Sequence, residues 1–335
     1  MSACAAGSRR APSRGWRGLV GVAVAATVAA LPGAAVAAPA DAVQVAQVAQ
    51  IAQGAQIAQG AQVAPPPSSP IVLRDDRGQE HRFDTPPRRI VSLLPSLTEA
   101  VFVLGGGARV VGVDRYSAWP AEVARLPRLG GLDDAPIEAI AALKPDVVLA
   151  STSARVLDRL DALGFRVLRM KSESHADVRR SLGVLATLLG TPQVAEPAWA
   201  RIRRQVADAA AQVPPAQRGR RVYFEIGGGP YAAGARSFIG ETLAELGLVN
   251  IVPDELGPFP KLNPEFVVRV RPEVVMGVQR DLQRFAARPG WHALPAVRDG
   301  RLCGFAAPQY DMLTLPGPRL GEAAALLAQC LRGLP

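Results

Sequence analysis

The sequence predicts an α/β protein with two Rossmann-like lobes, a single long α-helix that links them, and a cleft between the lobes. Short apolar runs alternate with short helical segments, which is typical of a parallel sheet covered by helices. The same succession of elements starts again in the second half of the chain. Between the halves, apolar residues recur at every fourth position, which indicates one uninterrupted helix.

Residues 1–37 are interpreted as an export signal. Arginines up to Arg17 precede an apolar run from Gly18 to Ala30, and Ala35-Val36-Ala37 is a small-x-small cleavage site. Cys4 lies before the apolar run, so it does not stand where a lipoprotein carries its lipid. Ser8-Arg9-Arg10 leaves twin-arginine export open beside the general secretory route. We therefore expect a mature protein outside the cytoplasm.

Residues 38–87 are interpreted as a low-complexity linker with a short lead-in. Residues 44–64 are seven Gln-x-Ala triplets, and a period of three places apolar residues on no fixed face of a helix or strand. The proline-rich segment 65–70 extends the chain further. A short strand at 71–73 and a turn at 75–78 then lead into the folded body.

The N-terminal lobe is predicted over 88–191. Apolar runs at 89–94, 110–113, 147–150 and 166–169 indicate strands buried on both faces. Ser96-x-x-Glu99 is a capping box that predicts a helix ending near Leu104. Two shorter helices are predicted at 137–143 and 157–163.

The linking helix is predicted over 192–213, with an apolar stripe at Val194, Ala198, Ile202, Val206 and Ala210. A helix of this length would span about 33 Å, the width of a small domain.

The C-terminal lobe is predicted over 214–335, starting with a strand at 222–226. Residues 136–150 align without a gap to 263–277. In this alignment Glu138 pairs with Glu265 and Pro145 with Pro272. Matches in the same order along both halves indicate two related lobes.

Composition argues against a nucleic-acid partner. The chain has 335 residues, 49% of them hydrophobic and 20% charged, with a net charge of +9. Loss of Arg9, Arg10, Arg14 and Arg17 with the signal would lower this to +5, and the remaining arginines are scattered. A scattered excess of arginine is typical of a solvated surface. We expect a monomer.

The cysteines and histidines leave several roles open. Cys303 and Cys330 would remain after cleavage, either as a disulfide or as two buried thiols. His81, His175 and His292 stand far apart in the sequence, and surface or structural roles are expected for each. No metal site of the protein's own is predicted.

Candidate ligand residues lie in the loops that follow the predicted strands, because ligands of open α/β sheets bind beyond the carboxyl ends of the strands. Aromatic rings stack on flat apolar ligands with little loss of side-chain entropy. Each ring could instead pack its own loop, and Asp311 could either bind the ligand or cap its loop. The candidates are Tyr116, Trp119, Tyr231, Phe259, Tyr310 and Asp311.

Enzymatic motifs are not found. Gly227-x-Gly229-x-x-Ala232 follows a strand as in a dinucleotide fingerprint, but Pro230 interrupts it and the next helix is predicted only from about Ser237. The sequence has no nucleophile elbow, His-Glu-x-x-His or Walker loop. We therefore predict that the protein is not an enzyme and needs no cofactor.

Glu138 and Glu265 are candidate docking residues. Each lies in the first turn of a short predicted helix, where the helix dipole favours a carboxylate, and this alone explains either one. Equivalent positions on two lobes would however present one carboxylate each to a two-fold symmetric partner.

The chain resembles the helical-backbone metal receptor family over residues 88–332. The resemblance is carried by Pro-Ser-x-Thr-Glu at 95–99, by Val-Gly-Val-x-x-Tyr-Ser-x-x-Pro at 111–120, by Glu-x4-Leu-Lys-Pro-Asp-x-Val at 138–148, and by the long helix. Tyr116, Phe259-Pro260 and Asp311 followed by Pro318-Arg319 are most similar to the cobalamin-binding members.

This resemblance implies a periplasmic substrate-binding protein that delivers a small-molecule metal chelate to the permease dimer of an inner-membrane ABC importer. Leu132 and Ser151 join the ligand candidates, because cobalamin-binding members present aromatic residues there, and Glu138 and Glu265 would dock on the permease. We expect cobalamin or a related corrinoid. The alternatives are a ferric siderophore or haem, a secreted enzyme that uses the cleft, or a structural surface protein.

Overall fold

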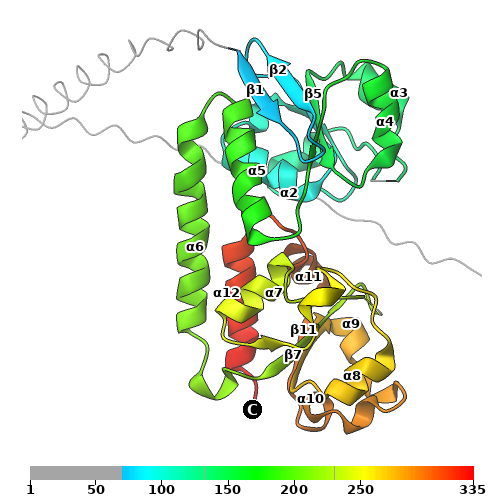
Figure 1. The fold of residues 1–335 in the computed structure, drawn as a ribbon, viewed down its shortest axis with the longest axis vertical. Coiled ribbons are helices and arrows are strands. Elements are labelled where there is room, and N and C mark those ends of the chain that lie inside the picture. Colours follow the sequence, from blue (N-terminus) through cyan, green and yellow to red (C-terminus); the bar gives the residue numbers. More distant parts are fainter. Residues whose placement is uncertain (1–69, 132, 230) are drawn as a thin grey trace, which may run out of the picture. The chain divides into compact units, whose positions relative to one another are not determined.

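The computed structural model describes residues 70–131, 133–229 and 231–335, and the export signal and the Gln-x-Ala repeats lie outside these residues. Besides a two-stranded hairpin near the N-terminal end of the described residues, two separate larger sheets form, so the prediction of two α/β lobes is confirmed (Figure 1). The four parallel strands of the N-lobe are β3 (Ile90–Ser92), β4 (Val110–Val113), β5 (Val147–Ser151) and β6 (Val167–Met170). The parallel strands of the C-lobe are β7 (Arg221–Ile226), β9 (Val249–Asn250), β10 (Val274–Val278) and β11 (Leu302–Phe305).

The two sheets share one strand order. The N-lobe order is β4-β3-β5-β6, and the C-lobe order is β9-β7-β10-β11, with β8 (Tyr231–Ala232) added antiparallel to β7. The aligned segments 136–150 and 263–277 form α3 (Ile137–Ala142) with β5 and α8 (Pro264–Val270) with β10. β10 is fully buried and β5 is buried up to Ala150, because helices cover both faces of each sheet.

Helices complete each lobe. The N-lobe has α2 (Pro95–Val103), α3, α4 (Asp158–Ala162) and α5 (His175–Leu188). The C-lobe has α7 (Phe238–Glu245), α8, α9 (Gln279–Leu282), α10 (Pro295–Arg298), α11 (Ala307–Leu313) and α12 (Leu320–Arg332). Within the described residues, no helix is long and apolar enough to cross a membrane.

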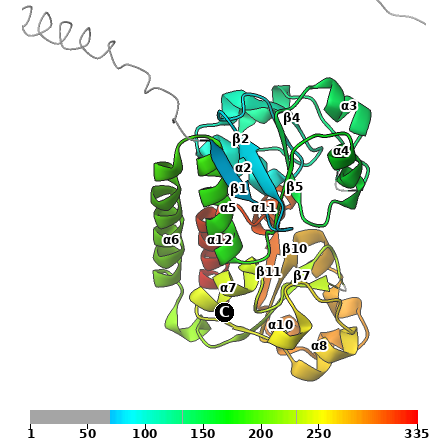
Figure 2. The ribbon, with the colours of Figure 1, turned by 45° about the horizontal axis from the view of Figure 1, so that its top comes forward.

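The linking helix is shorter than predicted. A 3₁₀ turn at Pro192–Val194 precedes α6 (Ala195–Ala211), and the amide of Val194 donates to the Thr191 carbonyl three residues earlier. The α-helical part therefore spans about 25 Å. α6 lies beside α12 in both views of the body (Figures 1 and 2). Ile202, Val206 and Ala209 form its buried face.

The capping box predicted at Ser96-x-x-Glu99 is wrong. α2 starts at Pro95, with Leu94 as the N-cap residue, and the amide of Thr98 donates to the Leu94 carbonyl. Proline suits the first helical position because it has no amide hydrogen to satisfy. The helix therefore begins two residues earlier, and both Ser96 and Glu99 are buried inside the protein.

A second departure is the helix that runs through 307–313, because Tyr310 and Asp311 are predicted to lie in a loop after a strand. Pro308 lies in the first turn of α11, and the amide of Tyr310 donates to the Ala306 carbonyl at 2.8 Å. The alanine-proline start is a helix signal that the sequence analysis does not use.

Cys303 of β11 and Cys330 of α12 form a disulfide, which decides between the two alternatives left open above. The histidines differ in exposure: His81 and His175 are buried and His292 is exposed. His81 Nε2 lies 3.3 Å from Asp75 Oδ2, and His175 Nε2 lies 2.9 Å from Thr242 Oγ1. The two buried histidines therefore have structural contacts.

Candidate functional site

A pocket of about 430 Å³ lies where the strands of the N-lobe end. We call it the N-lobe pocket. Its walls come from the loops after β3 and β4 and from the segment around Gly131. The lining residues are Leu93, Leu94, Pro95, Asp114, Arg115, Tyr116, Gly131, Asp133 and Asp134.

The loop after β4 is built around Asp114. The buried carboxylate accepts the Tyr116 amide at 2.8 Å and the hydroxyl of Ser117, which is the geometry of an Asx turn. Burial raises the pKa of Asp114, and the bond from Ser117 opposes that shift. The turn leaves the Tyr116 side chain 68% exposed at the pocket, where its ring is available to a ligand.

The segment around Gly131 gives the N-lobe pocket an acidic wall. Asp134 accepts the Gly131 amide at 2.7 Å and forms an ion pair with Arg115. The Gly131 amide and the Arg115 guanidinium together hold the pKa of Asp134 below its usual range. Asp133 is exposed beside it. Three aspartates and one arginine thus line the pocket, and that arginine is already paired with a carboxylate.

A second pocket, of about 290 Å³, lies where β10 and β11 of the C-lobe end. We call it the C-lobe pocket. Two amide side chains and one guanidinium surround an apolar floor. The lining residues are Val278, Gln279, Arg280, Gln283, Phe305, Ala306 and Ala307.

The glutamines of the C-lobe pocket are not among the predicted ligand residues, although the sequence contains a signal for them. The alignment that pairs 136–150 with 263–277 places Ser151 opposite Val278. The loop after β5 was treated as a candidate ligand loop, so its equivalent after β10 could have been included. The lining residues of each pocket belong to one lobe.

The remaining predicted ligand residues occupy different environments. Ser151 ends β5, and its hydroxyl lies 2.9 Å from that of Ser153. Tyr231 is 49% exposed on β8. The Trp119 ring is partly buried, with the guanidinium of Arg319, from the start of α12, 5.3 Å from its centre. The Trp119 ring, which belongs to the N-lobe, therefore contacts an arginine of the C-lobe.

Three further predicted ligand residues of the C-lobe are Phe259, Tyr310 and Asp311. The Phe259 ring packs against Phe238 at 5.9 Å. Tyr310 is buried, and its hydroxyl donates to the Glu225 carbonyl and accepts the Gly227 amide. Asp311 is exposed on α11, and Leu132 lies outside the described residues. The hydroxyl of Tyr310 is thus engaged within the lobe.

Glu138 and Glu265 lie in the first turns of α3 and α8, and both are exposed. Glu138 lies 3.7 Å from Arg159 in a largely exposed ion pair. The amide of Glu265 donates to the Asn263 side chain, which caps α8. Equivalent helices of the two lobes thus present a carboxylate at the same position, at water-exposed sites.

A third pocket, of about 200 Å³, lies between β7 and α8. The buried Glu225 carboxylate accepts two bonds from the Arg288 guanidinium, at 2.6 and 2.9 Å, and one from the Tyr223 hydroxyl. Burial and the neighbouring carboxylate raise the pKa of Tyr223. Because these charges compensate one another, the ion pair is a structural element of the wall.

The glycine-rich segment after β7 continues into β8, and α7 does not begin until Phe238. Gly228 and Gly229 have φ angles of 79° and 78°, which favour glycine. No helix N-terminus follows the glycines directly, as a dinucleotide site requires. Among the described residues, no cluster of three or more potential metal ligands occurs.

Comparisons with known proteins agree with this architecture. A family model described as "Periplasmic binding protein" matches residues 90–307. A cobalamin-binding protein of Halobacterium salinarum is 31% identical, over 78% of this chain and 74% of the relative. An uncharacterised ABC transporter substrate-binding lipoprotein of Bacillus subtilis is 27% identical, over 78% of this chain and 85% of the relative. The structure of the periplasmic haem-binding protein of Roseiflexus sp. RS-1 is similar, with a TM-score of 0.63, 27% identity, and coverage of 73% of this chain and 98% of that one.

Proposed function

From the premise that this chain belongs to the periplasmic binding protein family, and is therefore a binding protein for transport and not an enzyme, we propose that it binds a corrinoid outside the cytoplasm and delivers it to an ABC importer. The metal would arrive inside the ligand. The protein itself would act as a monomer in the periplasm.

The observation that carries the choice of ligand is the N-lobe pocket, where an exposed tyrosine ring stands beside three aspartates. Tyr116 can stack on a flat macrocycle. Corrinoids carry neutral amide side chains, whose N–H groups can donate to Asp133 and Asp134. Haem and many ferric siderophores carry carboxylates or other anionic groups, and these would meet like charges.

The C-lobe pocket supports the same choice. Gln279 and Gln283 offer both amide donors and amide acceptors, which complement amides on the ligand. Arg280 adds one cation there. A ligand with amides around its whole edge would find partners on both lobes.

Haem is the second candidate, favoured by the likeness to the haem-binding protein of Roseiflexus sp. RS-1. Titration of the purified protein with cobinamide, cyanocobalamin, haemin and a ferric siderophore would separate the candidates. We expect the corrinoids to bind with the lowest Kd. Tighter binding of haemin or of the siderophore, or no corrinoid binding at micromolar concentrations, would refute the corrinoid proposal.

The role of the aspartates can be tested directly. The double variant Asp133→Asn and Asp134→Asn should bind haemin about tenfold more tightly, since removal of two like charges gains about 1.4 kcal/mol even when water screens them. Corrinoid affinity should change much less. Asp208→Asn, on the exposed face of α6, is the matched control and should change the affinity for neither ligand. Unchanged haemin affinity in the double variant would contradict the electrostatic argument.

Docking on the permease is the second part of the proposal. Glu138→Lys together with Glu265→Lys should abolish transport while the Kd for the ligand is retained, because both side chains are exposed outside the two pockets. Glu80→Lys, an exposed charge reversal on the N-terminal hairpin, is the control that should still transport. Loss of ligand affinity in the double variant would show that these residues do not act in docking alone.

A further inference from the structure

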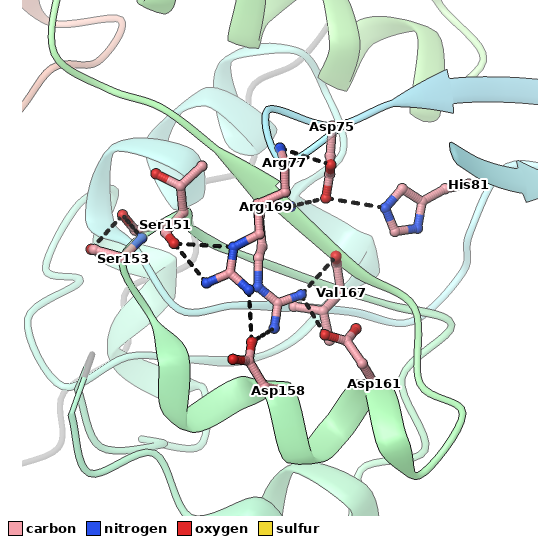
Figure 3. Close-up of polar contacts among 10 residues, drawn as sticks. Asp75, Arg77, His81, Ser151, Ser153, Asp158, Asp161, Val167 and Arg169 are labelled. Carbon is pink, nitrogen blue, oxygen red and sulfur yellow. Dashed lines mark hydrogen bonds and ion pairs between the residues drawn. The ribbon is translucent and has the colours of Figure 1, made fainter. Parts of the chain in front are cut away.

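The hairpin formed by β1 (Ile71–Arg74) and β2 (Glu80–Phe83) is fixed to the edge of the N-lobe sheet. Asp75, whose side chain is fully buried, accepts the amides of Arg77 at 3.0 Å and Arg169 at 3.3 Å, and it faces His81. The amide of Asp76 donates to the Arg169 carbonyl at 2.9 Å. These contacts join the hairpin turn to β6, the edge strand, and Figure 3 shows those that Asp75 makes.

Arg77 reaches beyond this edge to the loop after β5. Its Nε and Nη2 donate to the Thr152 carbonyl at 3.2 and 2.7 Å, and its Nη1 donates to Asp158 Oδ1 at 2.7 Å (Figure 3). The amide of Thr152 donates to the Met170 carbonyl at 3.3 Å. Both backbone polar groups of Thr152 are therefore hydrogen-bonded: the amide to β6, and the carbonyl to Arg77 of the hairpin.

The anchor for Arg77 is itself rigid. Asp158 Oδ1 also accepts a bond at 2.9 Å from Arg169, whose side chain is fully buried. Asp161 lies 2.7 Å from the same guanidinium. The bond from Arg77 and the two cations hold the pKa of Asp158 below its usual range, so this carboxylate stays ionised. A charged acceptor strengthens each of these hydrogen bonds.

Thr152 lies inside a tight turn. The Ser153 amide donates to Ser151 Oγ at 3.2 Å, and the Ala154 amide donates to the Ser151 carbonyl at 3.2 Å. The two serine hydroxyls are 2.9 Å apart on one side of the turn. Thr152 stands between these two serines, so a change in its backbone conformation would also disturb the turn that carries both hydroxyls.

We propose that Arg77 is a positioning residue for the ligand: from the N-terminal hairpin it fixes the Thr152 carbonyl and so holds the 151–155 loop in the conformation that receives the chelate. The inference rests on the proposed function, since the 151–155 loop follows β5, which pairs in parallel with β3, and so leaves the sheet at the same edge as the loops that line the N-lobe pocket. Arg77 does not itself touch the ligand. The hairpin thereby has a role in affinity in addition to covering a sheet edge.

Arg77→Gln is the decisive variant. If the loop then occupies its binding conformation about a tenth of the time, the Kd for cyanocobalamin rises about tenfold. The exchange rate of the Thr152 amide should rise similarly, because its bond to Met170 opens more often. Arg77→Lys keeps the charge but lacks the planar fork, so its Kd should lie between those of wild type and Arg77→Gln.

Two controls separate positioning from stability. Arg82→Gln alters an exposed hairpin arginine whose ion pair is with Asp84, at 4.0 Å. Asp76→Asn weakens the hairpin contacts to Arg180 and to the Lys171 amide, and it leaves the bonds from Arg77 to Thr152 in place. Both should leave the Kd and the Thr152 exchange rate within about twofold of wild type. Equal losses of affinity in Asp76→Asn and Arg77→Gln would overturn the proposal.

Failure of the proposed function and failure of the positioning role give different results in these experiments. If wild type binds no corrinoid, haemin or siderophore, the proposed function fails. The exchange rate of Thr152 then still decides whether Arg77 holds the loop. If wild type binds a chelate and Arg77→Gln leaves both the Kd and the exchange rate unchanged, only the positioning role is refuted.

Discussion

Replacement of the buried Glu99 by glutamine should remove a component of the pH dependence of folding. Glu99 lies on α2 with 3% of its surface exposed, and its Oε1 is 3.8 Å from Nη1 of Arg319 at the start of α12. Burial raises the pKa of Glu99 to about 7, although the Arg319 cation opposes the shift, and the Glu322 carboxylate adds to it.

The sign follows from proton binding. Glu99 binds a proton more tightly in the folded protein than in the unfolded chain, where its pKa is near 4.5. The stabilisation is therefore fully present below about pH 4.5 and is lost as the pH rises through about 7. Each pKa unit corresponds to about 1.4 kcal/mol, so the loss amounts to about 3 kcal/mol in the free energy of unfolding.

The assay is urea unfolding of wild type and Glu99→Gln, followed by tryptophan fluorescence at several pH values. The glutamine does not titrate, so the difference in free energy of unfolding between variant and wild type should shift by about 3 kcal/mol in favour of the variant between about pH 4.5 and pH 8. Glu122→Gln, an exposed substitution, should follow the wild-type curve. Parallel curves for Glu99→Gln and wild type would show that Glu99 is ionised over this range.

Three further substitutions test the packing around the site. Replacing Cys303 and Cys330 by alanine should lower the free energy of unfolding by about 3 kcal/mol, because the bridge closes a loop across 27 residues; an unchanged urea midpoint would contradict this. Arg288→Leu should cost about 3–5 kcal/mol in urea unfolding, since it leaves the buried Glu225 carboxylate unpaired, whereas adding Glu225→Leu should recover part of the loss. Tyr310→Phe should cost about 1–3 kcal/mol by the same measurement with little change in ligand Kd, because its hydroxyl bonds only within the C-lobe; a large change in Kd would place the hydroxyl at the ligand.

The position of the helices and strands could be predicted because their signals are local. The strand at 147–150 and its equivalent at 274–277 are continuous apolar runs behind a proline, and both are central strands in the structure. The start of α2 was misjudged because two local signals competed. Pro95 directly follows the strand predicted at 89–94, where a proline can end a strand, but in the structure it is the first residue of the helix.

The site could be predicted only in part. Tyr116 is a ligand candidate because it is an aromatic residue in a loop after a strand, and in the structure it lines the N-lobe pocket. The acidic wall was not found, since Asp133 and Asp134 come close to Tyr116 only when the chain folds back. Tyr310 gave the same local signal as Tyr116, but its ring stacks on Phe224 inside the lobe.

The sequence by itself determined the two related α/β lobes, their order and the helix between them, because hydrophobic period and proline placement act over a few neighbouring residues. Tertiary structure alone decided which distant groups meet. Arg77 reaches Thr152, and Arg319 reaches both Glu99 and Trp119. Such pairs depend on the packing of elements far apart in the chain, where a buried charge must find a partner that no local pattern specifies.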